Sequence, residues 1–319
     1  MANPGSLARL VSLLVIIMAD AGSSALLELS YTYNLDAPTS PKLTPFTYKV
    51  LKKGYNDFGV WVELNEFCAS EHSGTHLDAP VHFAKDRWGV SDIPLDRLWR
   101  VPAVVIDVSQ AIARSGQIDY PISVGDLEAW EKVHGVIPDH TLVLVRTGWG
   151  LKSGDMQAYS NVDETNTNHF PGLSKDFHDV FKVFYDVTIV PGLSKSKGLV
   201  VTGDSNVHSN GLLQNIVPGL SKVSYDVESA HEAMYSRNLF GLENVANMHK
   251  LPPSGFRVTI LPMRIGGGSG APARIVAELD QRAEPLASAS SRNVGASLAT
   301  LLPVFLPVLI AAVFGKRGA

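Results

Sequence analysis

Three histidines and one aspartate lie within eleven residues of the chain, at His72, His76, Asp78 and His82. All spacings between them are even, and side chains two residues apart point to the same face when the backbone is extended. Pro80 disfavours a helix and biases the residue before it toward extended geometry. Imidazole nitrogens and carboxylate oxygens are common metal ligands. The sequence therefore predicts a strand or extended loop with one metal-binding face.

Such a cluster suits metal-assisted hydrolysis. Nitrogen and oxygen donors without sulfur fit Zn²⁺ or Mn²⁺, whereas imidazoles make Mg²⁺ a poor match. A metal lowers the pKa of its water to about 7, so that hydroxide is available at neutral pH. An imidazole that is not a ligand can move protons between this water and a leaving nitrogen.

The alternatives are a purely structural metal, or histidines that are hydrogen-bonded within a core. Structural zinc sites usually have closed tetrahedral shells rich in cysteine, and Cys68 is the only cysteine. A functional site is therefore the preferred interpretation.

The composition indicates a folded chain with a substantial core. Its 319 residues are 45% hydrophobic and 18% charged, which is enough for one large domain or two ordinary ones. The formal net charge is −4 and no run of Lys and Arg marks a basic face, so we expect no nucleic acid partner.

Residues 1–25 have the layout of a secretory signal peptide. Arg9 precedes the apolar run 10–18, and small residues follow at 21–25. A positive start, an apolar middle and small residues at the cleavage site are typical of such signals. The sequence thus predicts entry into the secretory pathway.

Residues 281–319 are expected to form a linker and an apolar tail that tethers the protein to a membrane. A small-residue cluster at 287–291 precedes the uncharged apolar run 298–314, as in a GPI-attachment signal. Lys316 and Arg317 follow that run and favour instead a single span with a positive cytosolic end. Either tether predicts an extracellular or cell-surface protein.

Strand-like runs dominate the expected folded part, residues 26–280. Runs rich in Val, Ile and aromatic residues, as strands prefer, occur at 61–67, 103–108, 141–146, 256–265 and 273–279. A helix is expected at 123–134, where Ser123 and Asp126 form a capping-box pattern. Because several runs are apolar throughout, the sheets should be covered on both faces. The predicted fold is a mixed α/β domain dominated by sheet.

The pentapeptide Pro-Gly-Leu-Ser-Lys occurs three times, beginning at residues 171, 191 and 218. The intervals are unequal, so the repeat does not indicate a solenoid, whose period would be constant. Residues 176–222 are interpreted as an atypical insertion or as the product of an imperfect gene model.

The motif His-x-Gly-Thr-His-x-Asp-Ala-Pro-x-His-Phe at 72–83 resembles that of the metal-dependent cyclase family. His231, followed twelve residues later by the first residue of Glu-Asn-Val-Ala-Asn, extends the resemblance. Further matches are Arg-Thr-Gly-Trp from 146, His-Phe-Pro-Gly-Leu-Ser from 169 and Gly-Gly-Ser-Gly-Ala-Pro from 267. This family includes bacterial-type kynurenine formamidases and isatin hydrolases.

The resemblance implies a swivelling β/β/α domain, assembled as a homodimer or a higher homo-oligomer. It also implies two divalent metals per chain, Zn²⁺ or Mn²⁺, held by His72, His76, Asp78, His231 and Glu243. In that assignment His72, His76 and Asp78 hold the first metal, and Asp78 and Glu243 bridge it to the second, held by His231. His82 corresponds to the family's proton donor and acceptor.

Two departures from the family pattern concern the substrate pocket. Where the family usually has aromatic-Pro-Gly, this chain reads Ser-Pro-Lys at 40–42, and Phe46, Tyr55 or Trp61 are the candidate replacements. The family stretch Asp-Thr-x-Ser-x-Asp-x-Gly before the second histidine reads Tyr-Asp-Val-Glu-Ser-Ala at 225–230.

Three functional hypotheses follow. The first is a metal-dependent amidohydrolase that acts on a small-molecule amide, most like an arylformamidase that converts N-formylkynurenine to kynurenine and formate. The second keeps the chemistry but changes the substrate to isatin or to another cyclic amide or ester. The third is a membrane-tethered binding protein that has the fold but no turnover.

Overall fold

The computed structural model describes residues 24–40, 43–138, 140–165, 167–174, 200–203 and 230–280. All of them belong to the compact unit Met1–Ala283. The apolar tail, most of the expected signal peptide and most of the expected insertion lie outside the described residues. Within the described ranges, no helix has both the length and the apolar character needed to cross a membrane.

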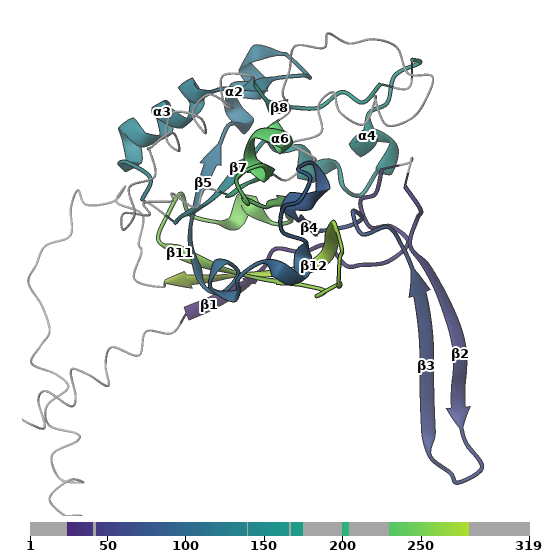
Figure 1. Ribbon diagram of the computed structural model, residues 1–319. Coiled ribbons are helices and arrows are strands. Elements are labelled where there is room, and N and C mark those ends of the chain that lie inside the picture. Colours follow the sequence, from purple (N-terminus) through teal and green to yellow (C-terminus); the bar gives the residue numbers. More distant parts are fainter. Residues whose placement is uncertain are drawn as a thin grey trace, which may run out of the picture. The chain divides into compact units, whose positions relative to one another are not determined.

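One mixed sheet organises these residues (Figure 1). Its strand order is β1-β12-β11-β5-β7-β9-β10-β4, and β4 also pairs with β12, so the sheet curls round until its β4 edge meets the strand beside the opposite edge. Its strands are β1 (Ser24–Glu28), β4 (His76–Asp78), β5 (Val101–Asp107), β7 (Leu142–Arg146), β9 (Val200–Gly203), β10 (Gly241–Glu243), β11 (Phe256–Pro262) and β12 (Gly270–Asp280). β5, β7, β9 and β10 run parallel to one another, and the other pairings are antiparallel.

Two small pairings and a few short helices complete the described part. The pairings are the hairpin β2 (Thr47–Tyr55) with β3 (Trp61–Cys68), and β6 (Pro121–Ile122) with β8 (Gly172–Leu173). The α-helices are α2 (Ser109–Ser115), α3 (Val124–His134), α4 (Met156–Ser160) and α6 (Ala230–Tyr235). Short 3₁₀ helices span Pro80–His82, Val90–Asp92, Leu95–Arg97, Trp149–Lys152 and Met248–Lys250.

The central strands are apolar because both of their faces are buried. Val105 of β5 and Leu144 of β7 belong to one apolar cluster, whereas Val104 and Val145 belong to another on the opposite face. The second cluster includes Leu127 of α3. Helix α3 lies beside β5 (Figure 1). Alternate side chains of a strand point to opposite faces, so a strand covered on both sides has no polar positions. The predicted sheet-dominated α/β domain with covered faces is confirmed.

The expected elements correspond closely to the observed ones. The five strand-like runs fall on β3, β5, β7, β11 and β12, and the expected helix is α3. At its start, Oδ2 of Asp126 accepts hydrogen bonds from the Ser123 N–H at 2.8 Å and the Ser123 hydroxyl at 3.0 Å. The capping residues thus act as the sequence predicts.

The first motif is not one extended stretch, which corrects that prediction. Only His76–Asp78 form a strand, and Ala79 is extended (φ −77°, ψ 153°) as expected before proline. The chain then closes into the 3₁₀ helix Pro80–His82, because the fixed φ of proline suits the first position of a helical turn. On the other side the chain turns at Gly74, where φ is +63° and the Tyr33 ring occupies the space of a side chain.

The β2–β3 hairpin pairs only with itself among the described strands, and most of its residues are exposed. Tyr48 lies opposite Phe67 and Tyr55 opposite Trp61, with the Tyr55 and Trp61 ring centroids 5.3 Å apart. Trp61 and Phe67 are six residues apart in one strand and therefore share a face. One face of this ribbon, which projects from the sheet in Figure 1, is thus aromatic and exposed.

Asp126→Ala removes the acceptor for both Ser123 donors. We expect it to lower the free energy of unfolding by about 1 kcal/mol, because Asp126 is the third residue of the capping box and its loss leaves the N–H of the N-cap residue Ser123 without its acceptor. Urea denaturation measures the change. Glu128→Ala, at an exposed position of the same helix, is the matched control. Equal denaturation midpoints for the two variants would contradict the capping role.

Candidate metal centre

Strand β4 places the candidate ligands because it pairs on both edges. His76 lies opposite Glu243 of β10, and Asp78 lies opposite Gly270 of β12. Directly opposite residues of an antiparallel pair have neighbouring side chains. Leu77 points to the other face and is fully buried in the apolar core. Three residues of strand therefore anchor the site and the core at once.

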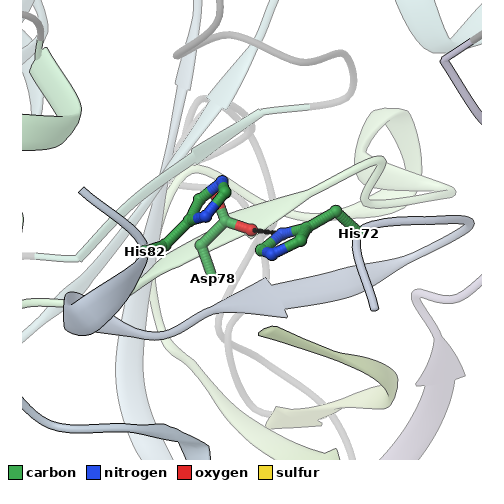
Figure 2. A group of neighbouring side chains, drawn as sticks. All are labelled: His72, Asp78 and His82. Carbon is green, nitrogen blue, oxygen red and sulfur yellow. Dashed lines mark hydrogen bonds and ion pairs between the residues drawn. The ribbon is translucent and has the colours of Figure 1, made fainter. Parts of the chain in front are cut away.

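Two turns bring the remaining residues of the motif back to Asp78. His72, Asp78 and His82 each offer a ligand atom, and these atoms lie within 4.8 Å of one another. Nδ1 of His72 is 2.7 Å from Oδ1 of Asp78, and the two imidazoles stack with centroids 3.8 Å apart. Figure 2 shows the three side chains converging.

A second group shares the same aspartate. His76, Asp78 and Glu243 also each offer a ligand atom, and these atoms lie within 4.8 Å of one another. Nε2 of His76 is 3.2 Å from Oδ1 of Asp78 and 3.7 Å from Oε2 of Glu243. His231, on α6, has its Nε2 3.5 Å from Oε1 of Glu243 and 3.8 Å from Oδ2 of Asp78. Asp78 is therefore the residue common to both groups.

The donors of the second group fit a divalent metal. His76, Asp78, His231 and Glu243 are all at most 5% exposed. Buried carboxylates are costly unless they are paired or bind a cation. Ligand atoms at roughly 2.0–2.2 Å from a tetrahedral zinc lie about 3.4 Å apart, and the distances from the imidazole nitrogens to the carboxylate oxygens here are 3.2–3.8 Å.

Hydrogen bonding fixes the orientation of His76. Its Nδ1 lies 2.9 Å from the carbonyl oxygen of Gly74, which can only accept, so Nδ1 carries the hydrogen. Nε2 is then the nitrogen that faces the two carboxylates. A backbone carbonyl behind a histidine is the usual arrangement for a metal ligand.

The pKa values reflect a buried cluster of opposite charges. Burial would lower the pKa of His76, but its hydrogen bond to Asp78 and the charges of Asp78 and Glu243 raise it to about 9. Burial would raise the pKa of Asp78, yet hydrogen bonds to His72 and His76 keep it well below its usual range. Burial lowers the pKa of His82 to about 4, and the charges of His72 and His231 act in the same direction. His82 is thus neutral at pH 7 and able to accept a proton or a metal.

All six predicted site residues come together around Asp78, and both His72 and His76 face its Oδ1. His82 lies with His72 and Asp78, whereas His76 lies with Glu243 and His231. The roles of ligand and proton carrier therefore stay predictions.

Sequence reasoning missed Tyr235, whose buried hydroxyl donates to Oδ2 of Asp78 at 2.9 Å. Burial, with the nearby charges of Asp78 and Glu243, raises the pKa of Tyr235 well above its usual value, so it remains a donor. The available signal was spacing, since residues four apart on a helix share a face and Tyr235 follows His231 by four.

The chain belongs to the Cyclase family, whose model matches residues 27–184. It is 32% identical to the isatin hydrolase of Roseibium aggregatum over 228 residues, which cover 70% of this chain and 77% of that one. It is 26% identical to the kynurenine formamidase of Bacillus anthracis over 254 residues, covering 80% and 97%. The structure of isatin hydrolase A from Ralstonia solanacearum superposes with a TM-score of 0.64 at 27% identity, covering 88% and 99%. These similarities support a hydrolase of this family and confirm the resemblance seen in the motifs.

Asp78→Ala removes the carboxylate common to both groups. We expect the purified variant to retain less than one tenth of the wild-type metal, because each group then loses a ligand and its negative charge. Elemental analysis measures the metal. Asp96→Ala, at an exposed position, is the control and should keep the full content. Full metal content in Asp78→Ala would show that Asp78 is not required.

Proposed function

We propose that this chain is a metal-dependent amidohydrolase that cleaves an amide bond whose nitrogen is attached to an aromatic ring. The observation that carries the proposal is the pair of ligand groups that share Asp78 within a buried cluster of histidines and carboxylates. We further propose two metals per chain, one for each ligand group, and we expect Zn²⁺ or Mn²⁺ because the donors are nitrogen and oxygen only.

N-formylkynurenine is the first candidate substrate and isatin the second. Both have a carbonyl group bonded to an aniline-type nitrogen. In both reactions water attacks the carbonyl carbon, and the nitrogen is protonated as the C–N bond breaks. The 26% identity to a kynurenine formamidase supports the first candidate, and the 32% identity to an isatin hydrolase supports the second.

The residues of the site would have three roles: metal binding, proton transfer and orientation of a ligand. His72, His76, Asp78, His231 and Glu243 would hold the metals. Metals bound there would supply a water of lowered pKa and polarise the substrate carbonyl. His82 is partly buried and neutral at pH 7, so it can take a proton from the attacking water and return it to the leaving nitrogen. Tyr235 keeps Asp78 oriented through its hydroxyl.

His82→Ala tests the proton-transfer role. We expect kcat for N-formylkynurenine or isatin to fall by about 10²–10⁴-fold, the usual contribution of a general acid–base group, with the metal content unchanged. His249→Ala, which removes an exposed imidazole, is the control. Loss of metal in His82→Ala would make His82 a ligand instead, and unchanged kcat would exclude both roles.

The same experiment separates enzyme from binding protein. Wild-type protein with a full metal content and no hydrolysis of either substrate would contradict the proposed amidohydrolase and favour the non-catalytic hypothesis.

We also propose that the protein is a homodimer in which the aromatic face of the β2–β3 hairpin contacts a second copy. A two-stranded ribbon is marginally stable by itself and usually needs packing on one face. Lys53 and Glu63 form a 3.0 Å ion pair on the aromatic face, between the two aromatic pairs. A face with both charges is self-complementary, as a two-fold interface requires.

Trp61→Lys replaces an aromatic side chain of this face with a charge, so we expect at least a tenfold weaker dimer by sedimentation velocity. Leu64→Lys, on the opposite face of the same strand, should leave the dimer intact. A monomeric wild-type protein, or equal effects of both variants, would contradict the proposed interface.

A further inference from the structure

Behind His72, away from Asp78, lies a short chain of hydrogen bonds. Nε2 of His72 is 3.0 Å from the Ser269 hydroxyl oxygen, and that hydroxyl donates to Oε2 of Glu71 at 2.8 Å. The same oxygen of Glu71 accepts the backbone N–H groups of Ser269 at 2.9 Å and Gly270 at 3.3 Å. Three donors therefore fix the Glu71 carboxyl group against the loop before β12.

Counting hydrogens assigns the direction of each bond. A serine hydroxyl has one hydrogen, and Ser269 gives it to Glu71. Toward His72 the Ser269 oxygen can then only accept, so Nε2 of His72 must carry a hydrogen and donate it. Nδ1, 2.7 Å from Oδ1 of Asp78, is left as the nitrogen that binds a proton or a metal beside that carboxylate.

Packing holds the imidazole in this orientation. A Cβ atom on Gly270 would lie closer than 3.0 Å to three atoms of the His72 ring, so the ring rests directly on the glycine backbone. The ring also stacks on His82, with the centroids 3.8 Å apart. A 180° flip of the ring would place carbon atoms where the two nitrogens now lie, and it would break the bond to Ser269 and the contact with Asp78.

We infer that Glu71 and Ser269 are positioning residues that hold His72 in the tautomer presenting Nδ1 to the metal. The inference rests on the proposed metal site. His76 is held the opposite way, since its Nδ1 donates to the Gly74 carbonyl and its Nε2 faces the carboxylates. The two ligand groups around Asp78 thus use different imidazole nitrogens, each selected by the hydrogen bond behind it.

The test measures Zn²⁺ affinity by competition with a chromophoric chelator. Loss of a hydrogen-bond partner behind a ligand costs about 10–100-fold in metal affinity. We expect that loss in Ser269→Ala and in Glu71→Gln, and recovery to within threefold in Ser269→Thr, which keeps the hydroxyl. Ser254→Ala, at an exposed position, is the matched control and should bind Zn²⁺ as the wild type does.

Nitrogen NMR of the zinc-loaded, ¹⁵N-histidine-labelled wild type checks the tautomer of His72 without a substitution in Ser269 or Glu71. The His72 signals, assigned by their absence in His72→Asn, should show a protonated Nε2 and a coordinated Nδ1.

The outcomes separate this inference from the proposed function. Wild-type protein that fails to bind Zn²⁺ would overturn both. Normal binding by the wild type together with unchanged affinity in Ser269→Ala would overturn only the positioning role. Coordination of the metal by Nε2 of His72 would also overturn only the positioning role. So would a Ser269→Thr variant that binds Zn²⁺ as weakly as Ser269→Ala.

Discussion

The burial of the Asp78 carboxylate is the constraint on which the rest of the site depends. A carboxylate that is 2% exposed must be compensated by hydrogen bonds and positive charge. Here the compensation comes from His72 and His76, which belong to the same motif, and from the Tyr235 hydroxyl of α6. Because β4 pairs with both β10 and β12, Asp78 sits where these segments can meet. The curl of the sheet and the cluster of ligands therefore have one geometric origin.

Much of this arrangement could be predicted from the sequence. Runs of apolar residues located the central strands, because strands buried on both faces must be apolar. The capping-box pattern located helix α3, because the first N–H groups of a helix need hydrogen-bond acceptors. The motif at 72–83 contained four of the six predicted site residues in one local pattern. Local patterns of this kind need no tertiary information. A local pattern predicts contacts between side chains that are separated by only a few residues of the chain.

The grouping of the ligands could not be predicted, because it depends on backbone turns and strand register. The 3₁₀ turn at Pro80–His82 moves His82 beside His72, whereas an extended chain would have placed it farther along the face. The pairing of His76 with Glu243 is a cross-strand contact between residues far apart in the chain. Ser269 was visible only within the Gly-Gly-Ser-Gly-Ala-Pro match from 267, and nothing local indicates that its hydroxyl reaches His72.

The brevity of β4 has a consequence for how this chain can vary in evolution. His76 and Asp78 face the ligands while Leu77, between them, is sealed in the core. A strand has a period of two, so the gain or loss of one residue here would exchange the two faces. Length changes must therefore accumulate in the connecting loops, where they leave this alternation intact. Substrate preference can diverge through those loops while the three-residue strand stays invariant in length.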